Sequence, residues 1–174
     1  EIMDARDVGL LSEYADVLQV GTRNMQNYTL LKELGKCDKP ILLKRGMWAT
    51  MAEFLGAAEY IINGGNENVI LCERGIRTFS DFSRNTLDLS IIPAIKDESH
   101  LPIISDPSHG TGRRSLVLPM SKASVACGAD GLLIETHPNP DKAISDADQT
   151  ISLSAFSKLM EDIKNITKAV GREV

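Results

Sequence analysis

Imidazole and carboxylate groups gather in the second half of this 174-residue sequence. Two short apolar runs there are each followed by an acid and a histidine, and further acids lie on the next stretch. These side chains are ligands of divalent transition metals such as Mn, Fe and Zn, which predicts a metal site. The candidates are Asp106, His109, Glu135, His137, Asp146 and Asp148.

Strong cations follow three earlier apolar runs, in a chain whose formal net charge is -5. They are Arg23, the pair Lys44 and Arg45, and then Arg74 with Arg77. Arginine matches phosphate and carboxylate bidentately and lysine adds a point charge, so their recurrence predicts an anion site. The alternative, for any one of them, is a surface base that pairs with an acid on a helix.

An anion site beside a metal site suits a phosphorylated or carboxylated substrate next to an activated carbonyl. Formation or cleavage of a carbon–carbon bond is the reaction class that this pairing favours. The sequence contains no glycine-rich nucleotide fingerprint and no phosphate-loop pattern, so we expect no nucleotide cofactor.

Elements of alternating type must position these residues. Apolar runs at 17–20, 41–43, 69–72, 102–105 and 132–134 predict buried parallel strands, whereas 52–62, 116–127 and 154–170 have helical periodicity. The strands recur about every 30 residues, which indicates repeated βαβ units. Either a doubly wound open sheet or an incomplete eight-stranded barrel fits, because a whole barrel needs ~250 residues.

Both architectures place functional groups at the carboxyl ends of the strands. His100 precedes a strand, so we expect it on the opposite rim with a structural role. Cys72 lies within a strand and is expected to be buried and inert. Met47 and Trp48 follow the Lys-Arg-Gly turn and could line the crevice, but the favoured expectation is that Trp48 packs under a loop. These expectations follow from position in the sequence alone.

Composition indicates one globular domain over residues 1–174, with 43% hydrophobic and 25% charged residues. No apolar run reaches the ~18 residues of a membrane span, and the negative charge disfavours a nucleic-acid surface. Three cysteines without a CxxC pair suggest free thiols in a reducing compartment. We therefore expect a cytoplasmic protein with no leader peptide.

Several strings resemble the metal-dependent 3-deoxy-D-arabino-heptulosonate 7-phosphate (DAHP) synthases, in the branch related to 3-deoxy-D-manno-octulosonate 8-phosphate synthase. The resemblance covers essentially the whole chain. It rests on GTRNMQN at 21–27, KPILLKRG at 39–46, ILCERGIRTF at 70–79, RNTLD at 84–88, DPSHGTGRR at 106–114 and ETHPNPDKAISDADQ at 135–149.

The resemblance implies a (β/α)8 barrel, here roughly strands 4 to 8 with their helices. It also implies a transferase that condenses phosphoenolpyruvate with erythrose 4-phosphate, giving DAHP and phosphate. That reaction is the first step of the shikimate pathway to the aromatic amino acids. The octulosonate synthase remains an alternative because it shares the CERG-like and ETHP-like strings, and so does a catalytically inactive, anion-binding fragment.

By resemblance, individual residues take roles where a motif matches. Lys44 and His109 are expected to be catalytic, and His137 is expected to lie beside the metal ligands. The GTRN and SDADQ strings depart from the usual pattern at Thr22 and Ala147. Phosphoenolpyruvate is expected to be bound by Thr22, Arg23, Lys44, Arg74 and Glu1, and a divalent metal ion (Mn, Fe, Zn or Co) by His109, Glu135 and Asp146.

The family's cysteine ligand on a first strand and its Lys-Pro-Arg-Thr string on a second have no match here. We therefore expect an amino-terminally truncated barrel, with negligible synthase activity if residue 1 is the start of the polypeptide. Open strand edges favour a homo-oligomer, and the resemblance implies one as well, because members of this family tend to form homodimers or homotetramers.

Overall fold

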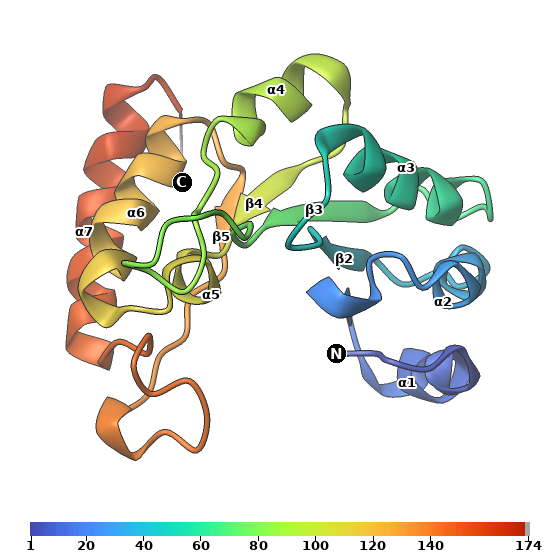
Figure 1. Cartoon of the computed structure of the whole chain (residues 1–174), viewed down its shortest axis with the longest axis horizontal. Helices are drawn as coiled ribbons and strands as arrows, with labels where there is room; N and C mark the ends of the chain where they lie inside the picture. The colour runs from blue at the N-terminus through green and yellow to red at the C-terminus, as the bar shows by residue number, and fades with distance from the viewer. Residues whose placement is uncertain (173–174) are drawn as a thin grey trace.

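A five-stranded, all-parallel sheet forms the centre of the molecule, described here from a computed structural model that covers residues 1–172. The strands lie in chain order β1-β2-β3-β4-β5, so that neighbours in the sequence are neighbours in the sheet (Figure 1). Their bounds are β1 Leu18–Val20, β2 Ile41–Lys44, β3 Val69–Glu73, β4 Ile103–Ser105 and β5 Gly131–Leu132.

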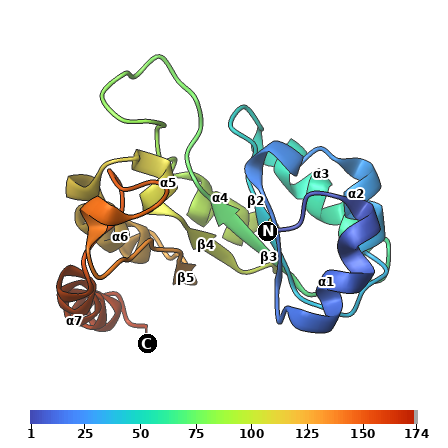
Figure 2. The same ribbon diagram turned by 90° about the horizontal axis from the view of Figure 1, so that it is seen from below.

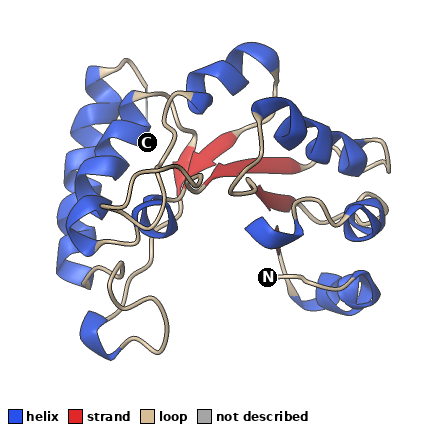
Figure 3. Cartoon of the chain, viewed as in Figure 1, coloured by secondary structure: helices blue, strands red, loops and turns tan. Residues whose placement is uncertain are grey.

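Helices connect the strands and follow one another in an arc around the outside of the sheet (Figures 1 and 3). The short 3-10 turns are η1 (Ala5–Asp7), η2 (Thr22–Asn24) and η3 (Pro140–Lys142). The α-helices are α1 (Val8–Tyr14), α2 (Tyr28–Leu34), α3 (Met51–Ile62), α4 (Ile91–Glu98), α5 (Pro107–Thr111), α6 (Arg114–Ala126) and α7 (Leu153–Ala169).

The strand order decides between the two architectures that the sequence left open. A doubly wound sheet reverses its order at a switch point, whereas this sheet runs from β1 to β5 without reversal. The second view shows the sheet twisting between the group α1–α3 and the pair α6–α7 (Figure 2). This arrangement is the wall of a barrel.

The five predicted strands are confirmed within three residues at each end, and so are the three predicted helices. Helices α1, α2, α4 and α5 were not predicted. Among the residues that the structure describes, no helix is both long and apolar enough to cross a membrane.

The hydrophobic core lies between the sheet and its outer helices. Strand β2 is buried along its whole length, and α3 contributes Phe54 and Ile61, which are fully buried. Val117 of α6 and Leu159 of α7 belong to a second, smaller cluster beside β5. Only β2 is buried at every residue, whereas Gln19, Ile70 and Ile104 at alternating positions of β1, β3 and β4 are half-buried.

Two glycines allow the ends of α2 and α3 to approach each other closely. A methyl group on Gly64 would lie 2.7 Å from the Cα of Gly35, and one on Gly35 would lie 2.6 Å from the carbonyl oxygen of Ile61. Gly56, within α3, has open space at the same position. The two helices thus meet backbone to backbone.

We predict opposite effects from one substitution at two of these glycines. Gly64→Ala should lower the free energy of unfolding by about 1–3 kcal/mol, because backbone must move. Gly56→Ala, the matched control, should raise it by about 0.5–1 kcal/mol through helix propensity. Urea unfolding followed by circular dichroism measures both, and equal changes in the two variants would contradict the close approach.

Candidate active site

A cavity of about 290 Å³ opens where the carboxyl ends of β1 to β4 converge. Cationic side chains dominate its wall, and they come from separate connections of the barrel wall. The charged lining residues are Arg23, Lys44, Arg74, Arg77 and Arg84, with His109, Glu1 and Asp146. The predicted register of cations after successive strands therefore does place them together.

Arg74 is the most unusual of these cations. The residue is 7% exposed, and its Nε and Nη1 atoms have no hydrogen-bond partner among residues 1–172. Burial lowers the pKa of Arg74, although the charge of Asp106 opposes that change. A buried guanidinium with unused donors on a cavity wall matches a site for an anion such as phosphate.

Lys44, at the end of β2, is held by a buried ion pair. Its Nζ lies 3.2 Å from Oδ2 of Asp106, and the two side chains are 7% and 0% exposed. The same carboxylate oxygen lies 2.8 Å from Nδ1 of His109. Burial alone would raise the pKa of Asp106, but the bonds from His109 and the charge of Lys44 outweigh it and lower the pKa.

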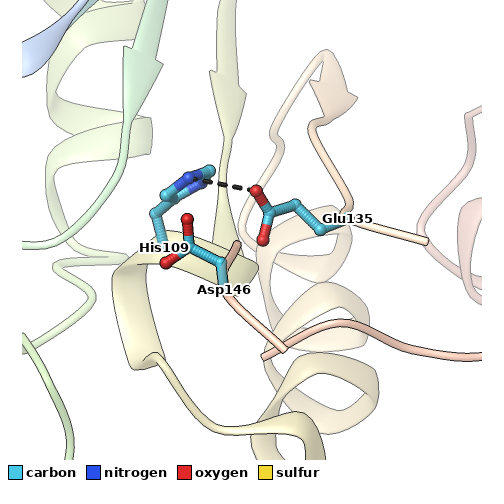
Figure 4. Close-up of side chains that lie close together, drawn as sticks. All are labelled: His109, Glu135 and Asp146. Atoms are coloured by element: carbon cyan, nitrogen blue, oxygen red, sulfur yellow. Dashed lines mark ion pairs between the residues drawn. The ribbon is translucent and has the colours of Figure 1, made fainter. Parts of the chain in front are cut away.

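Three of the predicted metal ligands meet at one point (Figure 4). His109, Glu135 and Asp146 each offer a ligand atom within 4.8 Å of the others, and Nε2 of His109 lies 3.3 Å from Oε1 of Glu135. Because Asp106 occupies Nδ1 of His109, Nε2 is left to face the cluster. One imidazole and two carboxylates fit a divalent transition metal.

Neighbouring side chains orient the two carboxylates. Gln149 donates its Nε2 to Oε2 of Glu135 at 2.8 Å, and Arg84 donates Nη1 to Oδ1 of Asp146 at 2.9 Å. The Oγ of Ser108 accepts the backbone N–H of Glu135. Neither Arg84 nor Gln149 was among the predicted site residues. The signal for both is their place within the family-like RNTLD and SDADQ strings.

The departure at Ala147 has a simple backbone explanation. Asp146 itself takes the left-handed conformation, with φ at 53°, and it is the non-glycine residue with positive φ in residues 1–172. Aspartate tolerates this region better than most residues. Alanine at 147 therefore meets no conformational penalty of that kind.

A second buried ion pair shapes the turn that carries Arg74. Nη1 of Arg45 contacts Glu73 at 3.0 Å and Asp88 at 2.9 Å. Glu73 also accepts the N–H of Gly75, which has φ at 90°. Burial raises the pKa of Glu73 more than Arg45 lowers it. Arg45 therefore supports the turn and does not line the cavity.

The predicted phosphoenolpyruvate-binding turn at Thr22 and Arg23 forms η2, and both residues line the cavity. Glu1 lines it as well and accepts a hydrogen bond from Gln19 at 3.0 Å. Lys44, Arg74 and these three residues thus share one cavity, although Arg23 is exposed.

Other candidates lie outside the ligand cluster. Nδ1 of His137 lies 2.7 Å from the carbonyl oxygen of Asn139, and His137 shares a groove with Glu135 but does not belong to the ligand cluster in the described part of the chain. Asp148 lines a separate groove, and Asp106 supports His109 instead of joining the cluster. Cys72 is fully buried, which raises the pKa of its thiol as expected for an inert cysteine.

The expectation that Trp48 packs under a loop is wrong. Its side chain is 71% exposed and lies 5.4 Å from the guanidinium carbon of Arg77, as a cation–π pair. The reason is that Trp48 follows a turn at the cavity rim, where the indole can cover an arginine and stay in water. His100 precedes β4, on the opposite rim from the cavity, as predicted.

Residues 1–171 match the family model described as "DAHP synthetase I family". A relative from Thermotoga maritima, named "Phospho-2-dehydro-3-deoxyheptonate aldolase", is 51% identical over 174 residues, which are 100% of this chain and 52% of that protein. A "2-dehydro-3-deoxyphosphooctonate aldolase" from Desulfotalea psychrophila is 30% identical over 183 residues, 98% of this chain and 64% of that protein.

Among solved structures, the truncated form of 3-deoxy-D-arabino-heptulosonate 7-phosphate synthase from Thermotoga maritima superimposes with a TM-score of 0.96 at 50% identity. The match covers 99% of this chain and 66% of that one. This likeness confirms the partial (β/α)8 barrel. The chain spans about half the length of the Thermotoga relative and about two thirds of the octulosonate relatives.

We predict that the Asp106 carboxylate is essential to stability. Asp106→Asn keeps an acceptor for the backbone N–H of His109 but leaves Lys44 buried without a counter-ion, so the free energy of unfolding should fall by about 3 kcal/mol or more. Glu33→Gln, which breaks the exposed pair with Lys36, is the control and should cost under about 1 kcal/mol. Guanidinium unfolding compares them; similar losses would contradict the buried-pair account.

Proposed function

Because this chain belongs to the DAHP synthetase I family, we propose that it forms the active site for condensing phosphoenolpyruvate with erythrose 4-phosphate. The products would be DAHP and phosphate, in the first step of the shikimate pathway. The Thermotoga relative at 51% identity supports this assignment over the octulosonate relatives, whose identities are 30% or lower.

The observation that carries the proposal is the buried guanidinium of Arg74, whose Nε and Nη1 have no hydrogen-bond partner among residues 1–172. It lies on a cavity wall that it shares with His109 and Asp146. An anion held there would satisfy the free donors and would lie beside the metal ligands. A synthase that joins a phosphorylated enol to an aldehyde needs both halves side by side.

We assign the phosphate of phosphoenolpyruvate to Arg74, to Arg23 and to the backbone of Thr22, and its carboxylate to Lys44. Glu1, which lies before β1 in the chain, would approach the same substrate from its place on the cavity wall. These cations would lie opposite the substrate anions, and the ion pair with Asp106 fixes the position of Lys44.

His109, Glu135 and Asp146 would hold a divalent metal ion, which we propose to be Mn, Fe, Zn or Co. When bound, such an ion supplies a Lewis acid at the aldehyde oxygen. Asp106 keeps His109 in the tautomer that presents Nε2, and Gln149 and Arg84 hold the carboxylates.

In the proposed reaction, the methylene carbon of phosphoenolpyruvate forms a bond to the aldehyde carbon of erythrose 4-phosphate. Water adds at the enol-phosphate carbon, and inorganic phosphate then leaves. The cationic wall stabilises the phosphate and carboxylate charges throughout and keeps the two substrates aligned.

Residues 1–174 are proposed to form one catalytic barrel domain, as roughly strands 4 to 8 of a (β/α)8 barrel in an amino-terminally truncated form. We also propose a cytoplasmic location and assembly as a homo-oligomer. An inactive anion-binding fragment is the less favoured alternative, because the metal cluster and its supporting hydrogen bonds serve no purpose in it.

Arg74→Met should separate binding from stability. Loss of the guanidinium should weaken phosphoenolpyruvate binding at least ~10-fold, because charge-assisted bonds disappear. The free energy of unfolding should stay the same or rise, because a buried donor without a partner is removed. Calorimetric titration and urea unfolding test this, with the exposed Arg113→Met as the control. Unchanged binding in Arg74→Met would contradict the anion site.

Substrate choice tests the reaction itself. The polypeptide in its native length should release phosphate from phosphoenolpyruvate with erythrose 4-phosphate at least ~10-fold faster than with arabinose 5-phosphate. EDTA should abolish the release, and added Mn²⁺ should restore it. Faster release with arabinose 5-phosphate would favour the octulosonate alternative, and no release with either sugar would favour the inactive one.

A further inference from the structure

The backbone at Thr111 and Gly112 packs closely against Arg84. It lies on the long connection after β3, where its backbone N–H donates to the carbonyl oxygen of Thr111 at 2.9 Å. Gly112 follows directly, with φ at 64°, and a methyl group there would lie 2.5 Å from the Cβ of Arg84. The aliphatic part of the Arg84 side chain therefore packs against Gly112, at a position where a larger residue would collide with it.

The guanidinium of Arg84 connects two of the three metal ligands. Its Nη1 lies 2.9 Å from Oδ1 of Asp146 and 3.3 Å from Oε1 of Gln149. The amide nitrogen of Gln149 continues to Oε2 of Glu135 at 2.8 Å. One side chain thus orients the carboxylates of both loops that follow β5.

Asp146 depends on this contact more than the other ligands do. Its left-handed backbone is held through its carbonyl oxygen, which accepts from the Oγ1 of Thr150 and the N–H of Gln149. Among residues 1–172, the ion pair with Arg84 is the hydrogen bond that fixes its carboxylate. The Asp146 side chain is 30% exposed, so it would otherwise be free to turn into water.

We propose that Arg84 is a positioning residue of the metal site, which holds Asp146 directly and Glu135 through Gln149. This inference rests on the metal site of the proposed function and adds a residue outside the ligand set. Because Arg84 also lines the cationic cavity, it ties the connection after β3 to the metal centre.

Two physical effects of Arg84 have opposite signs, which makes the proposal testable. A guanidinium close to a dication repels it, so charge alone predicts that removing Arg84 tightens metal binding. Loss of ligand orientation predicts weaker binding, and outer contacts of this kind typically contribute about 10–100-fold to metal affinity. The direction of the change therefore distinguishes positioning from simple electrostatics.

The experiment is a calorimetric titration of the chain with Mn²⁺ alone. Arg84→Gln should weaken Mn²⁺ binding at least ~10-fold, and Arg84→Lys should recover part of the loss. Arg113→Gln is the matched control, because this arginine lies over Phe82 and makes no hydrogen bond or ion pair with His109, Glu135 or Asp146 among residues 1–172. The Mn²⁺ affinity of this variant should stay within about twofold of the wild-type value. Unchanged or tighter binding by Arg84→Gln would overturn the proposal.

A second variant, Gln149→Leu, tests the same proposal if Arg84→Gln does not fold. Gln149→Leu preserves the size of the side chain but removes its bonds to Arg84 and Glu135, and it should weaken Mn²⁺ binding several-fold. Wild-type affinity in this variant would also overturn the proposal. A wild-type chain that binds no Mn²⁺ would instead contradict the metal site of the proposed function.

Discussion

The buried carboxylate of Asp106 is the interaction on which the rest of the site depends. One of its oxygens lies within hydrogen-bond distance of both Lys44 and His109, and the other accepts the backbone N–H of His109. A single carboxylate at the end of β4 therefore positions both Lys44, on the anion side of the cavity, and His109, on the metal side. Its ionised form persists despite full burial because two partners compensate the lost water.

Much of the fold follows from the sequence because each parallel strand coincides with a short, mainly apolar run, and the buried strand β2 is the clearest case. The order of the strands does not follow, since the same spacing serves a doubly wound sheet and a barrel. The two differ in which strands pair, and that is seen only in the structure. The helices that escaped prediction are short, at five to eight residues. One of them contains Pro93 near its start, and such helices form because their apolar side chains find the core, not because of periodicity.

The charged residues of the site could be predicted because parallel strands bring their carboxyl ends to one rim. What remained hidden are contacts between residues remote in sequence. Arg84 and Asp146 are 62 positions apart, as are Lys44 and Asp106. The prediction for Trp48 was wrong for a related reason: a single sequence does not distinguish an indole that is exposed beside Arg77 from one that is buried.

The left-handed backbone of Asp146 limits which residues evolution can accept there. Glutamate would keep a carboxylate, but it adopts this backbone conformation less readily than aspartate or asparagine does. Glycine and asparagine would suit the backbone, yet the first brings no ligand atom and the second no negative charge. Backbone geometry and ligand chemistry therefore select aspartate only in combination, because each alternative that satisfies one requirement fails the other.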